Sequence, residues 1–279
     1  MPDADVPDPL LPSDLPADPE ELADLALRTA VAAADMVRAE RRTGFGVETK
    51  STDTDMVTSL DKASDVLIRR LLLEARPDDG LMTEEDAEHT GTTGITWIVD
   101  PIDGTTNFVY GHPPYAVSIG AAVDGRPVAG AIVEISADDR YHAWLGGGSH
   151  RNGDLLHIGP PPALAQALIS TGFGYDPARR EAQAAVLARI VGQVRDVRRL
   201  GAAAYDLCSV AVGRIDGYYE HGLNAWDLCA GEIIAAEAGA AVEALTGGPA
   251  TPVEGILTAH PDLIGPLREL LLANGAGDL

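Results

Sequence analysis

The sequence predicts a mixed α/β protein built in layers, and three observations support this prediction. A strong hairpin signal, Asp124-Gly125, joins two apolar runs in the first half of the chain, which indicates neighbouring antiparallel strands. Strand-like and helix-like segments alternate in the second half, which is typical of crossover connections. The chain has 279 residues, 46% of them apolar, and can therefore bury a substantial core. Because hairpins and crossovers occur together, a doubly wound parallel sheet is not expected.

Residues 1–17 are the segment least able to fold. They hold five prolines and four aspartates and no lysine or arginine. Such a segment buries too little apolar surface to offset the conformational entropy that folding removes. We therefore predict a disordered, acidic, proline-rich tail over residues 1–17, followed by a single folded unit over residues 18–279.

Two helices are predicted next. Asp18, Pro19 and Glu21 are residue types favoured at an N-cap and in the first helical turn, and apolar residues then recur at helical spacing as far as Gly44. A second helical pattern follows residue 61 and ends before Pro77. The first half of the chain therefore begins with a helical layer.

Strands and helices can then be assigned in order along the chain. Apolar runs predict strands at residues 96–99, 116–123, 128–135 and 141–145. The second half alternates strands at 167–171, around 197, 217–220, 241–245 and 256–258 with helices at 178–193, 203–212, 226–238 and 261–273. A glycine-rich corner at 146–148 separates two closely packed halves, about 18–150 and 151–279, and no internal repeat is present.

The composition excludes several classes of partner. Lys and Arg total 20 against 43 Asp and Glu, a formal net charge of −23. Such a surface repels nucleic-acid phosphates and anionic membranes, so we expect neither as a partner. No apolar run of about 18 residues is present, and the acidic start does not resemble a signal peptide. Cys208 and Cys229 lack a CxxC or zinc spacing, so we expect inert core thiols in a cytoplasmic protein.

The distribution of acidic residues points to a site. Between Arg76 and Arg126 the 49 intervening residues contain nine carboxylates and no lysine or arginine. Four of these carboxylates lie in polar sequence and are predicted to be solvated surface residues, namely Asp78, Asp79, Asp86 and Glu88.

Asp100 and Asp103 differ because they end an apolar strand, where α/β proteins place their sites. Buried carboxylates need partners. With no basic residue nearby in the sequence, Mg²⁺ is one candidate partner, because it prefers oxygen ligands. A distant arginine folded over the pair is the other, and the spacing alone favours neither.

The residues after Asp103 favour the cation over the distant arginine as the partner of the two aspartates. Gly104-Thr105-Thr106-Asn107 predicts a turn that opens into a helical segment, and the free N–H groups of such a turn form an anion site. A cation site beside an anion site indicates a phosphate ester as the ligand. The hydroxyl of Thr105 would lie beside both and suits the orientation of a water molecule, although threonine at a helix start is more often a cap.

Two other phosphatase signatures can be excluded. A phosphoaspartate mechanism of the haloacid-dehalogenase type needs aspartates at i and i+2, whereas here the spacing is i and i+3. Cys208 and Arg214 have the Cys-x5-Arg spacing of tyrosine phosphatases, but Leu207 replaces their histidine and the glycine-rich cradle is missing. We interpret this second pattern as a chance match in a core helix.

Three segments resemble the inositol monophosphatase family. WIVDPIDGTTNF (residues 97–108) and WDLCAGEIIAAEAG (226–239) resemble its two signatures, and DGYYEHG (216–222) is similar to its substrate-side segment. The resemblance covers the chain from about residue 20 to its end. It implies a layered αβαβα sandwich of the sugar-phosphatase type and a homodimer.

The resemblance also implies roles for individual residues. It implies a site for two or three Mg²⁺ formed by Glu84, Asp100, Asp103, Asp227 and the carbonyl oxygen of Ile102. It implies catalytic roles for Glu84, Thr105 and Asp61, and places Lys50 on a mobile loop. The implied substrate-binding residues are Asp103, Gly104, Thr105, Gly201, Ala202, Ala203, Glu220 and Asp227.

The implied chemistry is hydrolysis without a phosphoenzyme. Mg²⁺ would neutralise the phosphate and activate a water that Glu84 and Thr105 orient for in-line attack. The leaving alkoxide would be stabilised by a metal near Asp227, and Li⁺ and Ca²⁺ would inhibit. Two departures from the family pattern are Thr83, where glycine is common, and Cys229, where alanine is usual.

The sequence therefore predicts a Mg²⁺-dependent phosphomonoesterase acting on myo-inositol monophosphate. Histidinol-phosphate phosphatase, fructose-1,6-bisphosphatase and nucleotide 3′-phosphatase share the fold and the metal acids and stay open as alternatives. Tyr218-Tyr219-Glu220 favours a polyol, because a carboxylate there suits a ring hydroxyl. A regulatory binding protein is a further alternative, against which the intact set of clustered acids argues.

Overall fold

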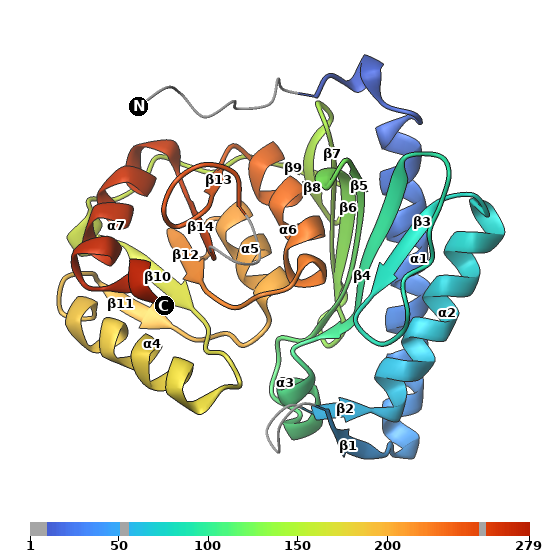
Figure 1. Ribbon diagram of the computed structural model, residues 1–279, viewed down its shortest axis with the longest axis horizontal. Coiled ribbons are helices and arrows are strands. Elements are labelled where there is room, and N and C mark those ends of the chain that lie inside the picture. Colours follow the sequence, from blue (N-terminus) through green and yellow to red (C-terminus); the bar gives the residue numbers. More distant parts are fainter. Residues whose placement is uncertain (1–9, 51–55, 251–254) are drawn as a thin grey trace.

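The computed structural model describes residues 10–50, 56–250 and 255–279, and it has five layers (Figure 1). Helices α1 (Pro19–Glu40) and α2 (Ser59–Ala75) form the first layer, and a seven-stranded sheet forms the second. Helices α5 (Ala203–Ala211) and α6 (Ala225–Glu237) fill the middle. A five-stranded sheet and helices α4 (Pro177–Ile190) and α7 (Pro261–Ala273) complete the molecule. The predicted αβαβα sandwich is confirmed.

The large sheet is a meander with one parallel pair. Its strands follow chain order: β3 (Gly80–Thr83), β4 (Ile95–Asp103), β5 (Ala116–Val123), β6 (Arg126–Glu134), β7 (Asp139–Trp144), β8 (Gly148–Arg151) and β9 (Asp154–Leu156). Only β3 and β4 run parallel. The hairpin turn between β5 and β6 is Asp124-Gly125, both with positive φ (51° and 74°), as an Asp-Gly turn requires.

The small sheet belongs to the second half of the chain. Its order is β11-β10-β12-β14-β13, with β10 parallel to both neighbours and β14 antiparallel to both. The strands are β10 (Leu168–Thr171), β11 (Asp196–Arg198), β12 (Gly217–Glu220), β13 (Ala241–Glu243) and β14 (Ile256–Ala259). A separate pair, β1 (Val47–Thr49) and β2 (Met56–Thr58), lies beside the short helix α3 (Thr105–Tyr110) (Figure 1).

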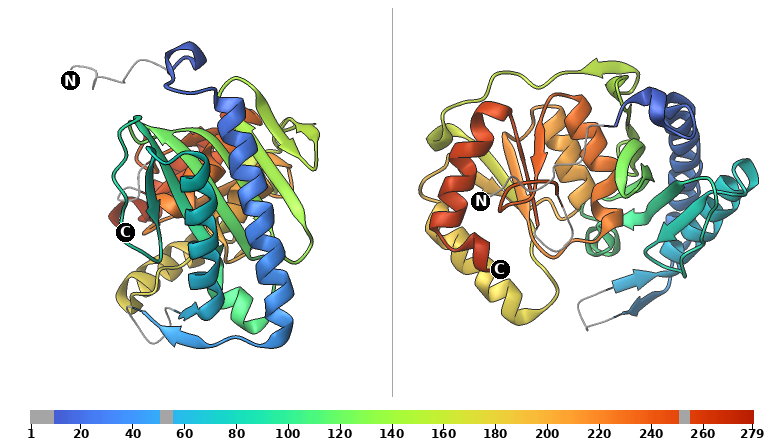
Figure 2. Two further views of the ribbon diagram at one scale, coloured as in Figure 1. Left: turned by 90° about the vertical axis from the view of Figure 1, so that its right-hand side faces the viewer. Right: turned by 45° about the horizontal axis from the view of Figure 1, so that its top comes forward.

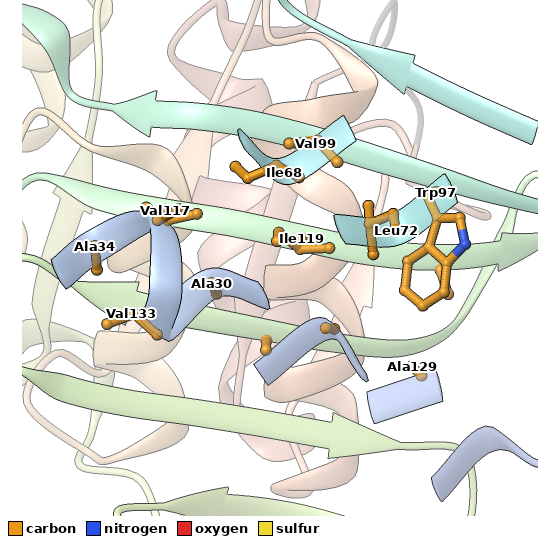
Figure 3. Close-up of a cluster of buried hydrophobic side chains, with 14 of the residues drawn as sticks. Ala30, Ala34, Ile68, Leu72, Trp97, Val99, Val117, Ile119, Ala129 and Val133 are labelled. Atoms are coloured by element: carbon orange, nitrogen blue, oxygen red, sulfur yellow. The ribbon is translucent and has the colours of Figure 1, made fainter. Parts of the chain in front are cut away.

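Small side chains let α1 lie close to the large sheet. Its buried face carries five alanines, and α1 and α2 lie side by side across one face of the sheet (Figure 2). Trp97 and Val99 of β4 and Val117 and Ile119 of β5 fill the space beneath them (Figure 3). The alternation of residues 97 and 99 follows from the two-residue period of a strand, which directs alternate side chains to one face.

The other face of the large sheet receives α6. A Cβ atom at Gly120 would lie 2.4 Å from Cys229 Sγ, and one at Gly130 would lie 2.8 Å from the Cα atom of Ala230. The two glycines therefore set how close the helix comes. Cys208 and Cys229 are both free and buried, and burial raises the pKa of each thiol. These environments suit inert thiols.

The predicted tail differs from the structure over part of its length. Residues 1–9 lie outside the described residues. Pro12–Asp14 form a 3-10 turn, and Leu10, Leu15 and Ala17 pack against the core beneath α1. The prediction of disorder therefore does not hold for residues 10–17, because three apolar side chains among the prolines find a partner surface.

One predicted surface acid is buried. Asp79 is 1% exposed, and its carboxylate accepts hydrogen bonds from Arg76, from Thr93 and from Trp97 Nε1 at 3.0 Å. The prediction that Asp79 is solvated is wrong, because three donors from different segments meet there.

None of the helices in the described part of the chain has the length and apolar content needed to span a bilayer.

Candidate active site

A cavity of about 170 Å³ lies between the two sheets, where several element ends meet. The end of β4 and the starts of α3, α5 and α6 contribute to it, as do the end of β12 and the loop before α4. Its lining includes Glu84, Asp100, Ile102, Asp103, Gly104, Thr105, Gly201, Ala202, Ala203, Glu220 and Asp227. Eleven of the thirteen predicted site residues thus lie at one place, whereas Asp61 and Lys50 are not among the lining residues.

An irregularity in β4 brings two acids to the same side. Residues three apart in a regular strand point to opposite faces. The ladder between β4 and β5 shifts register between Asp100 and Asp103, and the N–H of Ile102 donates to Asp100 Oδ1 at 3.0 Å. Both carboxylates consequently line the cavity.

Three carboxylates converge there. Asp100, Asp103 and Asp227 each place one oxygen within 4.8 Å of the others. Asp103 Oδ2 accepts a hydrogen bond from the N–H of Ala204 at 2.9 Å, at the start of α5. Asp227 lies in the first turn of α6, where its Oδ2 accepts from the N–H of Asn224 at 2.6 Å. The backbone therefore holds all three acids in place before any ligand binds.

This arrangement is electrostatically unfavourable without a cation. Burial, followed by repulsion from Glu84 and Asp103, raises the pKa of Asp100 well above its usual range. Burial also raises the pKa of Asp103 to about 7 and that of Asp227 well above its usual range. An all-oxygen donor set with uncompensated negative charge fits a hard divalent cation such as Mg²⁺. The cluster is therefore able to hold a metal ion.

Glu84 lines the same cavity but lies outside this group of three. Its Oε1 accepts from Lys50 Nζ at 2.8 Å, and Lys50 also pairs with Glu85. Lys50 therefore supplies the positive charge that the local sequence lacks. Burial raises the pKa of Glu85, whose side chain is 6% exposed. The sequence analysis gave Glu85 no role, because Glu84 beside it matches the metal-binding glutamate of the family. Residues 51–55, which follow Lys50, lie outside the described residues.

Thr105 connects the cavity to Asp61. The Thr105 hydroxyl lies 3.1 Å from Asp61 Oδ1 and 3.1 Å from the Ile102 carbonyl oxygen. Asp61 Oδ2 accepts from the N–H of Thr58 at 2.9 Å and from its hydroxyl. Burial raises the pKa of Asp61 to about 6. Asp61 thus lies behind Thr105 and reaches the cavity through it.

Glycine is required where β4 turns into α3. Gly104 has φ of 84°, and a Cβ there would lie 3.1 Å from Ala202 Cβ and from the carbonyl oxygens of Gly201 and Pro114. Its conformation turns the chain from β4 into α3 and exposes the N–H groups that follow. At Gly104 the large-sheet half packs closely against Gly201 and Ala202, the segment before α5.

Glu220 lines the cavity from the end of β12. Its Oε2 accepts from the hydroxyl of Tyr218 at 2.8 Å, and burial raises its pKa to about 7. A Cβ at Gly172 would stand 1.9 Å from Glu220 Oε2, so a glycine there makes room for the carboxylate. Sequence reasoning missed Gly172, because nothing near it in the chain shows that β10 ends beside β12.

The sequence profile described as the inositol monophosphatase family matches residues 18–273. The chain belongs to the inositol monophosphatase family. It is 46% identical over 244 residues to inositol-1-monophosphatase of Mycobacterium bovis, covering 81% of this chain and 84% of the relative.

Solved structures agree with this membership. The extragenic suppressor protein suhB of Bartonella henselae superposes with a TM-score of 0.85 at 31% identity, covering 90% of this chain and 98% of that one. SaIMPase-II of Staphylococcus aureus, solved with inositol monophosphate bound, gives a TM-score of 0.72 at 29% identity over 91% of this chain and 97% of that one. These TM-scores show that the fold of this chain is similar to that of both proteins over nine-tenths of its length.

Two arginines complete the cavity and were not predicted. Arg179 lies in the first turn of α4 and Arg199 follows β11, and both line the cavity. Neither lies within a recognisable family signature, and each is separated by many residues from the acids it faces. Only the pairing of β11, β10 and β12 brings their segments to the site.

Proposed function

We propose that this protein is a Mg²⁺-dependent phosphomonoesterase that hydrolyses myo-inositol monophosphate to myo-inositol and phosphate. The observation that carries the proposal is the group of Asp100, Asp103 and Asp227, one oxygen of each within 4.8 Å, in a cavity that also presents Gly104 and Thr105. Family membership and the inositol monophosphate bound to SaIMPase-II support the choice of substrate.

Five groups would hold the metal. They are the carboxylates of Glu84, Asp100, Asp103 and Asp227 and the carbonyl oxygen of Ile102, for two or three Mg²⁺. Bound Mg²⁺ would neutralise phosphate charge and lower the pKa of a coordinated water. Glu84 now pairs with Lys50, so binding of a cation would exchange one positive partner of this carboxylate for another. Li⁺ and Ca²⁺ would compete for the same oxygen ligands.

The hydroxyl of Thr105 would orient the attacking water. When Asp61 is ionised, the Thr105 proton points to Asp61 Oδ1, 3.1 Å away, and the oxygen lone pairs then face the cavity. That orientation lets Thr105 accept a hydrogen bond from water. Glu84 would accept the second hydrogen bond and the proton. The N–H groups after Gly104 would hold the phosphate oxygens.

The opposite wall would hold the sugar. The backbone of residues 201–203 lines the cavity beside Asp103, and Glu220 faces it from the end of β12. A half-buried carboxylate fixed by Tyr218 accepts a hydrogen bond from a ring hydroxyl without reorganising. This feature favours a polyol phosphate.

The same site could serve other phosphate esters of the fold. Phosphate release should be measured for inositol 1-phosphate, histidinol phosphate, fructose 1,6-bisphosphate and a nucleoside 3′-phosphate, with and without Mg²⁺, and ranked by kcat/KM. Inositol 1-phosphate should rank first and its hydrolysis should require Mg²⁺. If no ester releases phosphate with Mg²⁺, the regulatory alternative replaces the proposal.

We further propose a cytoplasmic homodimer without nucleic-acid partners. The net charge of −23 supports the exclusion of nucleic acids. Light scattering of the purified protein tests the oligomeric state, and a monomer at micromolar concentration would contradict it.

A further inference from the structure

A buried side-chain amide joins the two halves of the molecule beside the cavity. Asn107 lies in α3, just after the turn that the proposed function assigns to the phosphate. Its Nδ2 donates to the carbonyl oxygen of Pro114 at 2.8 Å and to that of Leu200 at 2.7 Å. Pro114 leads into β5 of the large sheet, whereas Leu200 lies between β11 and α5. The two N–H donors of the amide are thus used, one toward each half of the chain.

The segment that contains Leu200 leads into the wall proposed to hold the sugar. Residues 199–202 connect β11 to α5 without belonging to a helix or a strand, and residues 201–203 line the cavity. The contact is close, because a Cβ at Gly201 would lie 2.9 Å from Asn107 Nδ2. A segment outside helices and strands has no backbone ladder to fix it, so a tertiary hydrogen bond has a large influence on its position.

Helix α3 does not depend on this amide for its own position. Arg41 Nη2 donates to the Phe108 carbonyl oxygen at 3.0 Å, and the guanidinium lies 5.0 Å from the centroid of the Phe108 ring. Phe108 is fully buried and also packs against the Phe45 ring, with 4.9 Å between the centroids. Loss of the amide should therefore displace residues 199–202 rather than α3.

We propose that Asn107 is a positioning residue that sets the distance between the bound phosphate and the wall that holds the sugar. This inference rests on the proposed phosphomonoesterase function. Asn107 is not among the residues that line the cavity, so it acts through Leu200 on residues 201–203. The start of α5 has its own link to the metal-binding acids, because the N–H of Ala204 donates to Asp103 Oδ2 at 2.9 Å. The effect of Asn107 should therefore fall more on the polyol part of a substrate than on its phosphate.

The test compares two substrates on matched variants. Asn107→Leu has a similar volume and no donor, and Asn107→Asp keeps the shape but replaces the donor by an acceptor. Steady-state kinetics at saturating Mg²⁺ give kcat and KM for inositol 1-phosphate and for p-nitrophenyl phosphate, which has no polyol hydroxyls. Tyr110→Ala is a control on the same helix, since Tyr110 is 74% exposed. Phe45→Leu is a second control, because it loosens the packing of α3 and leaves the amide in place.

The ratio of kcat/KM for inositol 1-phosphate to that for p-nitrophenyl phosphate should fall at least tenfold in both Asn107 variants. The fall should come mainly from a higher KM for inositol 1-phosphate. The ratio should stay within about twofold of the wild-type value in Tyr110→Ala and Phe45→Leu, even where the melting midpoint falls. Equal losses on both substrates in the Asn107 variants, or an unchanged ratio, would overturn this inference and leave Asn107 a packing role.

A binding measurement separates this inference from the proposed function. If the wild type releases phosphate from no ester, the proposed function fails. Calorimetric titration of inositol 1-phosphate into Ca²⁺-loaded wild type and Asn107→Asp still tests the positioning role. An affinity at least tenfold weaker in the variant supports that role, and equal affinities overturn it.

Discussion

The hydroxyl oxygen of Thr105 lies 3.1 Å from Asp61 Oδ1, so a buried carboxylate behind the cavity controls where the hydroxyl proton of a cavity residue points. Asp61 is itself fixed by two donors from Thr58, in a capping box at the start of α2. A helix cap in the first layer is thereby linked to the position of the proposed attacking water.

Thr105→Val should remove that link while keeping the side-chain volume. Valine can neither donate to Asp61 nor accept from water, so kcat on inositol 1-phosphate should fall roughly 100-fold or more, with a smaller change in KM. Steady-state kinetics at saturating Mg²⁺ measure the effect. Thr105→Ser is the control, since it keeps the hydroxyl and should recover most of the activity. Equal losses in both variants would assign Thr105 a packing role only.

Asp100→Asn tests the acid cluster. Burial and then repulsion from neighbouring acids raise the pKa of Asp100, and asparagine removes both costs of the charge, so the metal-free protein should keep or gain stability. Mg²⁺-dependent turnover should be lost, because an amide oxygen is a weaker ligand for Mg²⁺. Asp78→Asn is the matched control, since Asp78 is exposed and outside the cavity. Wild-type turnover in Asp100→Asn would refute the proposed metal site.

The metal-free protein should become less stable as pH rises from about 5.5 to about 7.5. Asp61 (pKa about 6), Asp103 (about 7) and Glu220 (about 7) all have folded-state pKa values above those of the unfolded chain. The folded state then binds more protons than the unfolded state, and the free energy of unfolding falls with pH by about 1.4 kcal/mol per unit for each proton of difference. Urea denaturation in a chelator at several pH values measures this slope.

Mg²⁺ should oppose this loss of stability at higher pH. A bound cation favours the ionised carboxylates, so stabilisation by millimolar Mg²⁺ should be larger at pH 7.5 than at pH 5.5. Stability in chelator that is constant, or that rises with pH over this interval, would show that these acids are ionised without a metal.

Gly120→Ala tests how α6 is placed. The added Cβ would lie 2.4 Å from Cys229 Sγ and 3.0 Å from the backbone nitrogen of Ala230, so the helix must move. Overpacking of this kind costs about 1–3 kcal/mol of unfolding free energy. Because Asp227 lies on α6, the apparent Mg²⁺ affinity should fall as well. Gly159→Ala is the control, because no atom lies within 4 Å of its added Cβ and its stability should match that of the wild type.

Local sequence predicted those parts of the site that are continuous in the chain. Asp100, Asp103 and Thr105 belong to one strand-turn-helix segment, and its apolar run and glycine are visible without a structure. The register shift that brings both aspartates to the cavity depends on the pairing of β4 with β5. It cannot be predicted from the sequence of β4 alone. Asp227 and Glu220 are distant in the chain from this segment, and only the family resemblance assigned them to the site. Arg199 lies in none of the quoted signatures and was missed; it reaches the cavity through the parallel pairing of β10 with β11.

Burial also changed what individual residues do. Asp79 looked like a surface acid because its neighbours are polar, but Trp97 of β4 donates to it across 18 positions of the chain. The sequence predicted no fold for the segment of Leu10 and Leu15, because it holds few apolar residues. Both side chains nevertheless pack against the apolar core that includes the buried face of α1. In both cases a partner distant in sequence supplied the stabilisation that local composition lacked.

Glu220→Gln addresses the choice of substrate. Glu220 is fixed by the Tyr218 hydroxyl at 2.8 Å and is not one of the three acids whose oxygens lie within 4.8 Å of one another, so its change should leave that group intact. If it accepts a hydrogen bond from a ring hydroxyl, the charged bond contributes roughly 1.5–3 kcal/mol. The kcat/KM for inositol 1-phosphate should then fall roughly ten- to a hundredfold in Glu220→Gln, when measured above pH 7, where the wild-type carboxylate is mainly ionised.

The loss should be selective, and p-nitrophenyl phosphate is the control substrate because it has no ring hydroxyl for Glu220 to bind. Its kcat/KM should change by less than about twofold, since its phosphate would meet only the metal-binding acids Asp100, Asp103 and Asp227 and the N–H groups after Gly104. The wild-type enzyme should also lose its preference for inositol 1-phosphate as pH falls below about 7, because a protonated Glu220 no longer accepts as strongly. Equal losses on both substrates would instead place Glu220 with the metal ligands, and no loss on either would remove it from the site.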